Sequence, residues 1–209
     1  LASILINAIV QLAGNATIIG LVLTMLCCIV LGMGVPTTAN YCIMAATCAP
    51  ILMSPQIGIP RVCAHFFVFY FGIVADITPP VALAAYAGSA IAKSNPMKTG
   101  INATKLAIAA FIVPYIIAMN PAMLFINTTI PEVVMITITS IIGIFGVAAG
   151  LSGFVFRDMK WWERILCIVG GLTLLVPGSL TDLIGLVLVG AVCVLGYQAA
   201  KKEKEMLTA

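Results

Sequence analysis

Charged residues are scarce in this sequence: they make up 8% of its 209 residues, whereas 62% are hydrophobic. Soluble domains carry roughly 25% charged residues, so a water-soluble fold of this length could not cover its surface. The net charge of +3 is small and scattered, which excludes a nucleic-acid-binding surface. His65 is the only histidine, and no His-Glu-x-x-His or Gly-x-Ser-x-Gly sequence occurs, which argues against an intramembrane enzyme.

Two further absences concern cysteine spacing and the start of the chain. None of the seven cysteines forms a Cys-x-x-Cys pair, and most lie in apolar runs, so we interpret them as small hydrophobic residues. No basic leader and no initiating Met precede the first apolar residues. We therefore expect the chain to be part of a longer protein.

Apolar runs fill most of the sequence, and a spanning helix needs about 20 such residues. After the end of a helix at 1–13, the runs cover residues 16–33, 38–53, 61–93, 101–119, 132–151, 162–176 and 182–199. The last four are typical of ordinary spans. The run 38–53 is short for a span, and the run 61–93 is interrupted. The sequence thus predicts an all-α polytopic membrane protein with a polar tail.

The basic residues predict the orientation in the membrane. If the tail is cytoplasmic, the loops 152–161 and 93–100 are also cytoplasmic. Two predicted spans lie between the tail and loop 152–161, and two more lie between that loop and loop 93–100. Nine of the ten basic residues then lie at the cytoplasmic face: Lys93, Lys98, Lys105, Arg157, Lys160, Arg164, Lys201, Lys202 and Lys204. Arg61 alone lies outside, so loop 54–60 is external. The runs 16–33 and 38–53 then favour a re-entrant hairpin open to the outside, which is tolerated only where protein or water satisfies its backbone.

The tip of this hairpin has the composition of an ion site. It contains two glycines, a proline and three residues with neutral oxygens: Gly32, Gly34, Pro36, Thr37, Thr38 and Asn40. Glycines allow an unwound backbone, and Pro36 lacks the N–H that would pair with the carbonyl of Gly32 in a helix. We expect Thr37 or Thr38 to act as the N-cap of the second limb, whose positive end could face an anionic substrate.

A second interruption, Asp76-Ile77-Thr78-Pro79-Pro80, lies inside the run 61–93. The two prolines should free the carbonyls of Ala75 and Asp76 and break the helix at mid-membrane, where secondary transporters bind substrates and coupling ions. Proline kinks repaired by neighbouring helices are the alternative for both stretches. Asp76 is the only acid deep in a membrane segment and is a functional hypothesis by default, the alternative being an N-cap on a half-helix that begins at Pro79.

His65 precedes Asp76 by eleven residues, on nearly the same helical face but roughly 16 Å away along the axis. We expect it to bond a neighbouring backbone group rather than to relay protons. The aromatic residues around it favour packing. Trp161 and Trp162, beside three basic residues, are typical of an interfacial belt.

Residues 31–50 and 64–100, which contain both interruptions, resemble the large membrane subunit of tripartite ATP-independent periplasmic (TRAP) transporters, most closely the TAXI type with fused subunits. The resemblance runs from about residue 14 to 125. It implies that residues 1–125 are the carboxy-terminal half of the transport domain, in the second of two inverted repeats. That half holds the hairpin at about 16–53, the broken helix 61–93 and the helix 101–119. Residues 126–209 then add transmembrane helices and a cytoplasmic tail.

The resemblance also implies a sodium site between the two interruptions, next to an organic-anion substrate. We expect Na⁺ near Gly32, Thr37, Thr38, Asp76 and Thr78, with Gly34, Pro36, Asn40, Pro79 and Pro80 completing the ion and substrate site. No other cofactor is expected. The implied partners are a periplasmic substrate-binding protein, a small membrane subunit or its fused equivalent, the absent amino-terminal half of the permease and the lipid bilayer of a bacterial or archaeal inner membrane.

The leading interpretation is therefore a sodium-coupled, binding-protein-dependent importer of a carboxylate-bearing solute, working as an elevator. The alternative is a proton-coupled carboxylate carrier of another class that uses Asp76 and His65, and uptake by that carrier would survive replacement of sodium by choline. An intramembrane enzyme is the third and weakest interpretation.

Overall fold

A computed structural model of the chain describes residues 2–14, 16–176 and 178–208. These residues form helices joined by short loops, with one isolated β-bridge between Phe154 and Asp158. The chain divides into two compact units, Leu1–Leu124 and Phe125–Ala209. The prediction of an all-α polytopic membrane protein is confirmed, and each unit is described by itself below.

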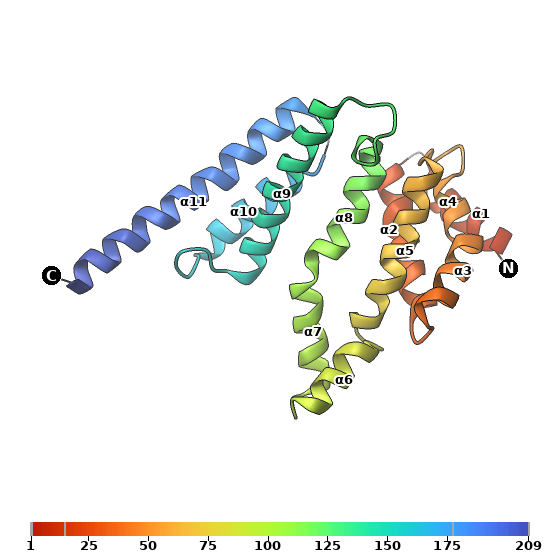
Figure 1. Cartoon of the computed structure of the whole chain (residues 1–209), viewed down its shortest axis with the longest axis horizontal. Helices are drawn as coiled ribbons and strands as arrows, with labels where there is room; N and C mark the ends of the chain where they lie inside the picture. The colour runs from red at the N-terminus through yellow and green to blue at the C-terminus, as the bar shows by residue number, and fades with distance from the viewer. Residues whose placement is uncertain (1, 15, 177, 209) are drawn as a thin grey trace. The chain divides into compact units, whose positions relative to one another are not determined.

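The helices of the first unit are mostly short. In chain order they are α1 (Ala2–Ala13), α2 (Thr17–Gly32), α3 (Thr37–Thr47), α4 (Ala49–Leu52), α5 (Arg61–Val74), the 3₁₀ helix η1 (Ala75–Ile77), α6 (Leu83–Ile91), α7 (Pro96–Leu106), α8 (Ile108–Met119) and the 3₁₀ helix η2 (Pro121–Leu124). Helix α5 lies in the middle of this unit and packs against α2, α3 and α8 (Figure 1).

Helices α2 and α3 form the predicted hairpin, with its turn at residues 33–36. The turn needs glycine, because Gly34 has a φ of +77°, in the left-handed region that glycine adopts without strain. The second limb differs from the predicted continuous run at 38–53. It is divided at Cys48 into α3 and α4, because Pro50 begins a new turn and has no N–H for the preceding one.

The predicted break after α5 is present, and it is longer than expected. The chain leaves the α-helix at Val74, makes one 3₁₀ turn, and resumes as α6 only at Leu83. The alternative in which a half-helix begins at Pro79 is therefore wrong. Ala82, the residue before α6, is in the left-handed region with a φ of +34°, so the prolines are followed by a turn rather than by a helix.

The prediction of one ordinary span at 101–119 is also corrected. The structure has two helices there, α7 and α8, which begin at Pro96 and are bent by 41° at Ala107. Pro114 lies inside α8 and cannot donate to the carbonyl of Ala110. One backbone hydrogen bond of α8 is therefore missing near this proline. Hydropathy alone does not reveal this interruption.

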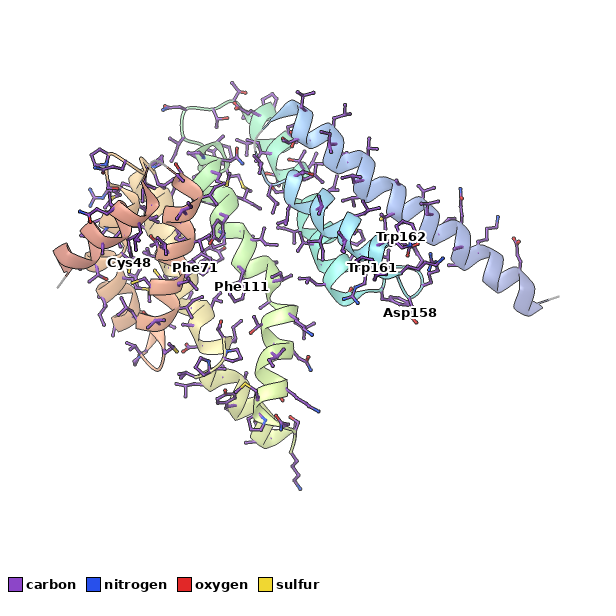
Figure 2. The ribbon with its side chains drawn as sticks, turned by 180° about the vertical axis from the view of Figure 1, so that it is seen from behind. Cys48, Phe71, Phe111, Asp158, Trp161 and Trp162 are labelled. Atoms are coloured by element: carbon purple, nitrogen blue, oxygen red, sulfur yellow. The ribbon has the colours of Figure 1, made fainter. Side chains whose placement is uncertain are left out.

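Aromatic side chains form the core between α5 and α8. Phe67 and Phe71 are fully buried, and their ring centroids lie 4.8 Å apart. Tyr115 of α8 packs edge-on against both, at 5.3 and 5.8 Å, and Phe111 adds a contact with Phe71 at 6.2 Å. Figure 2 labels Phe71 and Phe111 at this contact. Such pairs stabilise beyond their burial by about 0.5–1.5 kcal/mol each.

The second unit consists of α9 (Ile130–Ser152), α10 (Trp161–Thr173) and α11 (Ser179–Thr208), with α10 packed on both of the others. Glycines bring the backbones together. A Cβ added at Gly171 of α10 would lie 2.6 Å from the carbonyl oxygen of Gly143 in α9, and one at Gly185 of α11 would lie 2.6 Å from that of Gly170. Close approach through small residues is the usual way that membrane helices pack.

Two described helices are long and apolar enough to cross a membrane by themselves, Ile130–Ser152 and Leu180–Lys201, and the bent pair α7–α8 makes up to three. The expected ordinary span at 162–176 is wrong, because α10 has 13 residues and reaches only about 20 Å at 1.5 Å per residue. The hydrocarbon core is about 30 Å thick. The predicted orientation counted α10 as a full crossing, so the cytoplasmic tail stays a prediction.

Candidate functional site

The hairpin tip and the break after α5 are far apart in the sequence and close together in the structure. A Cβ added at Gly32, the last residue of α2, would lie 3.0 Å from the Cβ of Ala75, the first residue of η1. It would also lie 2.8 Å from the side-chain nitrogen of Asn40 in α3. Three segments therefore meet at one point, and a side chain at position 32 would displace the Asn40 amide.

Asn40 is the side chain that links these segments. It is 1% exposed, and its Nδ2 donates to the carbonyl of Gly72 at 2.9 Å and, at a longer 3.5 Å, to that of Gly32. Its Oδ1 is buried and has no partner among the described residues. The sequence predicted Asn40 as an oxygen ligand, whereas the structure uses its amide as a donor and leaves the oxygen free.

The two carbonyls that Asn40 contacts belong to the ends of helices. Gly32 is the last residue of α2, and Gly72 lies in the last turn of α5. The last carbonyls of a helix have no intrahelical partner and carry the negative end of its dipole. Two such ends converge here, and Asp76 follows one of them directly. The sum of these partial charges and the carboxylate favours a cation.

The backbone carbonyls near the two prolines accept hydrogen bonds that the sequence did not predict. The carbonyl of Ala75, expected to be free, accepts from the backbone N–H of Thr78 at 3.3 Å. Further along, the carbonyl of Ile77 accepts from the hydroxyl of Thr104 at 3.1 Å, and that of Pro80 accepts from the hydroxyl of Tyr86 at 2.6 Å. Side-chain hydroxyl groups of α6 and α7 thus stabilise the break by donating hydrogen bonds to its carbonyls.

Among the acidic and hydroxyl side chains predicted at the site, only that of Thr78 forms a hydrogen bond within the described residues: its Oγ1 donates to the carbonyl of Val74 at 2.7 Å. Asp76 is partly buried, and no hydrogen bond reaches its carboxylate within the described part of the chain. Because α6 begins at Leu83, Asp76 is not its N-cap. The alternative prediction, in which Asp76 is a structural cap on this half-helix, is therefore wrong.

Thr37 and Thr38 occupy the exposed first turn of α3. The N-cap of this helix is Pro36, with no side-chain cap bond, so the expectation that a threonine caps the second limb is wrong. The hydroxyls are free for another role at the amino terminus of α3. Gly34 and Pro36 are exposed beside them, in the turn of the hairpin.

His65 lies away from this junction. Its Nδ1 is 3.1 Å from the hydroxyl of Tyr41 in α3, so its partner is a side chain and not the backbone group that was expected. In the described residues no hydrogen bond joins His65 to Asp76. Nor do these residues contain a group of three or more His, Cys, Asp or Glu side chains placed to hold a metal ion.

Sequence reasoning located both interruptions and missed what joins them. The donors Thr104 and Tyr86 lie outside the motifs, and the two acceptors of Asn40 are 8 and 32 residues away. The sequence did contain one signal of this link, an asparagine one turn after the glycine and proline of the hairpin tip. Its partners depend on the packing of α3 against α5.

Comparisons with known proteins agree with the resemblance. Residues 1–133 match the family model described as "Tripartite ATP-independent periplasmic transporter, DctM component". Residues 133–189 match a second model, described as a domain of unknown function, DUF3394. No curated protein and no solved structure matches the chain.

Proposed function

The chain belongs to the DctM family of tripartite ATP-independent periplasmic transporters, and we propose that it is the carboxy-terminal part of a sodium-coupled permease that imports an organic anion. The family is one of transporters, not of enzymes, and it works with a periplasmic binding protein and a small membrane subunit. Sodium coupling, the anionic solute and an elevator-like motion are the parts of this proposal that go beyond family membership.

One observation carries the proposal: the carboxy-terminal ends of α2 and α5 converge on Asn40, beside the unpaired Asp76. Sodium is a hard cation that prefers oxygen ligands, and discontinuous helices with negative ends are where secondary transporters hold coupling ions. The free Oδ1 of Asn40 is a further neutral oxygen at this junction. We place the ion here, with Thr78 and the tip threonines as candidate hydroxyl ligands.

The anion fits next to this site. Helix α3 begins at Thr37, and its first N–H groups have no intrahelical acceptor. A carboxylate at this positive end would lie close to a bound sodium ion, so each charge would stabilise the other. This mutual stabilisation is a physical basis for coupling, because either ligand binds more weakly when the other is absent.

An elevator-like motion requires the hairpin and the broken helix to move as one body. The Asn40 amide bonds α3 to α5 at 2.9 Å inside an environment that excludes water. A buried bond of this kind keeps the two elements together when the ion site changes sides. The alternative proton-coupled mechanism has less support, because His65 is bonded to Tyr41 and not to Asp76.

The test is sodium-dependent uptake by the full-length permease with its binding protein. Thr38→Val and Thr78→Val keep the volume and remove one oxygen, and Asp76→Asn removes the charge. Losing one ligand to an ion costs about 1.5–3 kcal/mol, or roughly ten- to a hundredfold in affinity. We expect the half-saturating sodium concentration to rise by that factor for each threonine variant, and coupling to fail for Asp76→Asn.

Thr47→Val is the matched control, because Thr47 lies on the same helix and its hydroxyl bonds within that helix, to the carbonyl of Ile43. Its sodium dependence should stay unchanged. If the three site variants all transport with the normal sodium dependence, the two interruptions are only kinks. If choline replaces sodium without loss of uptake, the proton-coupled alternative is correct.

A further inference from the structure

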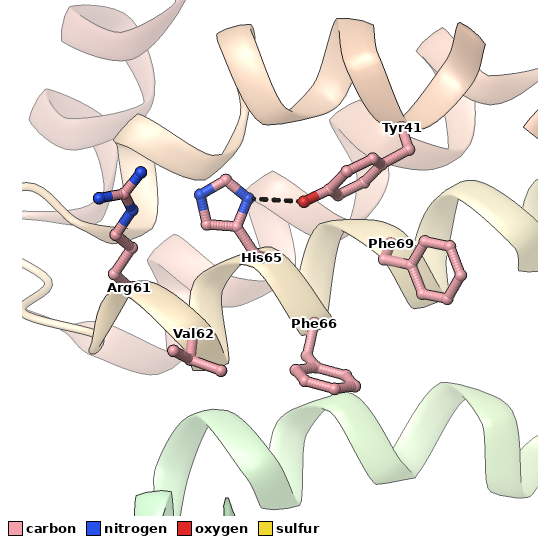
Figure 3. Close-up of a pocket in the computed structure, with 6 residues that line it drawn as sticks. All are labelled: Tyr41, Arg61, Val62, His65, Phe66 and Phe69. Atoms are coloured by element: carbon pink, nitrogen blue, oxygen red, sulfur yellow. Dashed lines mark hydrogen bonds between the residues drawn. The ribbon is translucent and has the colours of Figure 1, made fainter. Parts of the chain in front are cut away.

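A hollow of about 540 Å³ opens beside α5, at some distance along the helix from the break. Its walls combine basic, aromatic and aliphatic side chains: Tyr41, Arg61, Val62, His65, Phe66 and Phe69. Figure 3 shows Arg61 and His65 next to each other on one side of α5, with Tyr41 reaching His65 from α3. Sites for small molecules have volumes of about 300–1,000 Å³ and a mostly apolar lining with few polar groups.

The polar groups of the hollow suit an anion. Arg61 and His65 are four residues apart on α5 and therefore share a helical face. Arg61 is exposed and forms no ion pair within the part of the chain that the structure describes. Its planar guanidinium matches the two oxygens of a carboxylate. The hydroxyl of Tyr41, at 3.1 Å, holds the imidazole of His65 in place next to it.

The remaining lining residues suit an apolar body. Val62, Phe66 and Phe69 follow the helical spacing i, i+4, i+7 and are 51%, 40% and 41% exposed. The ring of Tyr41 packs edge-on against Phe69 at 5.7 Å. The aromatic face and the two basic groups are therefore parts of one hollow, in contrast to Phe67 and Phe71 on the buried face of the same helix.

We propose that this hollow binds an organic carboxylate with an apolar body, its carboxylate on Arg61 and its body on Phe66 and Phe69. The site is distinct from the junction at Asn40, because none of its lining residues belongs to the hairpin turn or to the break. The proposal rests on the proposed function in one respect: in the predicted topology the Arg61 end of α5 faces outside, where the solute arrives. The hollow then receives the anion before the ion-coupled site does.

The experiment measures equilibrium binding of radiolabelled 4-phenylbutyrate to the full-length permease in phosphatidylcholine nanodiscs, with protein-free nanodiscs as the background. Arg61→Gln should lower the affinity by about ten- to a hundredfold, since a charged hydrogen-bonding group is lost. Tyr41→Phe retains the ring and should lower it by about tenfold or less. Lys98→Gln, which removes an exposed cation outside the hollow, should have no effect.

Two ligand controls and one ion control complete the test. 4-Phenylbutanol, which lacks the charge, should not compete, and butyrate, which lacks the aryl body, should compete weakly. Binding should persist when choline replaces sodium, so this result is independent of whether transport is sodium-coupled. Equal loss of affinity in Arg61→Gln and Lys98→Gln would overturn the proposal. Displacement of the probe by phosphatidylglycerol added to the nanodiscs, but not by unlabelled carboxylate, would overturn it in favour of a lipid site.

Discussion

The two units of the chain build membrane helices in different ways. In the first, helices are interrupted at residues 33–36 and 75–82, and side-chain amides and hydroxyls take up the carbonyls of the breaks. In the second, α9 and α11 run 23 and 30 residues without interruption, and the buried ion pair of this unit lies in the loop 153–160 and the start of α10. Polar side chains link interrupted helices in one unit and stabilise helix ends in the other.

The loop of the second unit illustrates this difference. Glu163 is 4% exposed; it accepts from the backbone N–H of Lys160 at 2.8 Å and pairs with Arg157 at 2.6 Å. Arg164 donates to the last carbonyls of α9, those of Gly150 and Leu151. Arg157, Glu163 and Arg164 thus each have a structural partner, in contrast to Asp76. Figure 2 shows Asp158, Trp161 and Trp162 together at this end of the unit.

This difference predicts that charge removal destabilises the second unit and impairs binding in the first. Glu163→Ala should have the largest effect on folding, because it leaves Arg157 partly buried without its partner, at a cost of up to about 3–5 kcal/mol. The measurement is thermal unfolding of the purified protein in detergent. Asp76→Asn is the matched comparison and should unfold near the normal temperature. A normal melting temperature for Glu163→Ala would remove the distinction between the units.

The second-largest effect is expected for Asn40→Leu, which should lower both the stability of the protein and its affinity for sodium. It keeps the volume but removes the amide that donates to the carbonyl of Gly72, and an unsatisfied buried group costs about 1–3 kcal/mol. The carbonyl of Gly32 retains the backbone N–H of Val35 as a donor, at 3.4 Å. Met44→Leu, one turn further along α3 and fully buried, is the control and should cost under about 1.5 kcal/mol. Sodium affinity, measured by uptake at graded sodium concentrations, should fall only for Asn40→Leu.

A loss of stability in Asn40→Leu without any change in sodium affinity would show that Asn40 holds the hairpin against α5 and nothing more. Asn40→Asp sharpens this test. It keeps Oδ1 and replaces the amide nitrogen with a second oxygen, so the donor is lost while an oxygen ligand remains. The variant therefore separates the role of the free oxygen from that of the hydrogen bonds.

Gly171→Ala tests the close helix packing of the second unit. The added Cβ would lie 2.6 Å from the carbonyl oxygen of Gly143, and overpacking of this kind costs about 1–3 kcal/mol. Gly190→Ala, on α11, is the control, because an added Cβ there meets nothing within 4 Å. Thermal unfolding should therefore separate the two variants. Equal melting temperatures would mean that the helices of this unit can move apart at little cost.

The smallest effect is expected at the exposed end of α11. Lys201 and Glu205 are 4.0 Å apart and each side chain is 68% exposed. Exposed pairs at this spacing contribute about 0.3–0.5 kcal/mol. Lys201→Gln should leave the melting temperature within experimental error, both in low salt and in high salt. A clear shift in the melting temperature would show that solvent exposure does not decide which charged residues contribute to the stability of this unit.

Sequence reasoning located the interruptions at Gly32–Asn40 and Asp76–Pro80, because glycine and proline act on their own backbone and need no distant partner. It also predicted membrane helices correctly at Ile130–Ser152 and within Ser179–Thr208, where hydropathy is continuous. It failed at α10 and at the bend of Ala107. Both segments lie in predominantly apolar stretches of sequence, and hydropathy does not report where a short helix ends or where two helices bend relative to each other.

By itself, the sequence determined that the chain is helical, membrane-embedded and broken at two places, since these properties follow from local composition. Only the tertiary structure decided that the two breaks meet, that Asn40 donates to both and keeps a free oxygen, and that Arg61 and His65 share a hollow with aromatic residues. The physical reason is that a buried polar group must find its partner wherever packing brings one. For Asn40 that partner lies 32 residues away, on a helix that no local pattern connects to it.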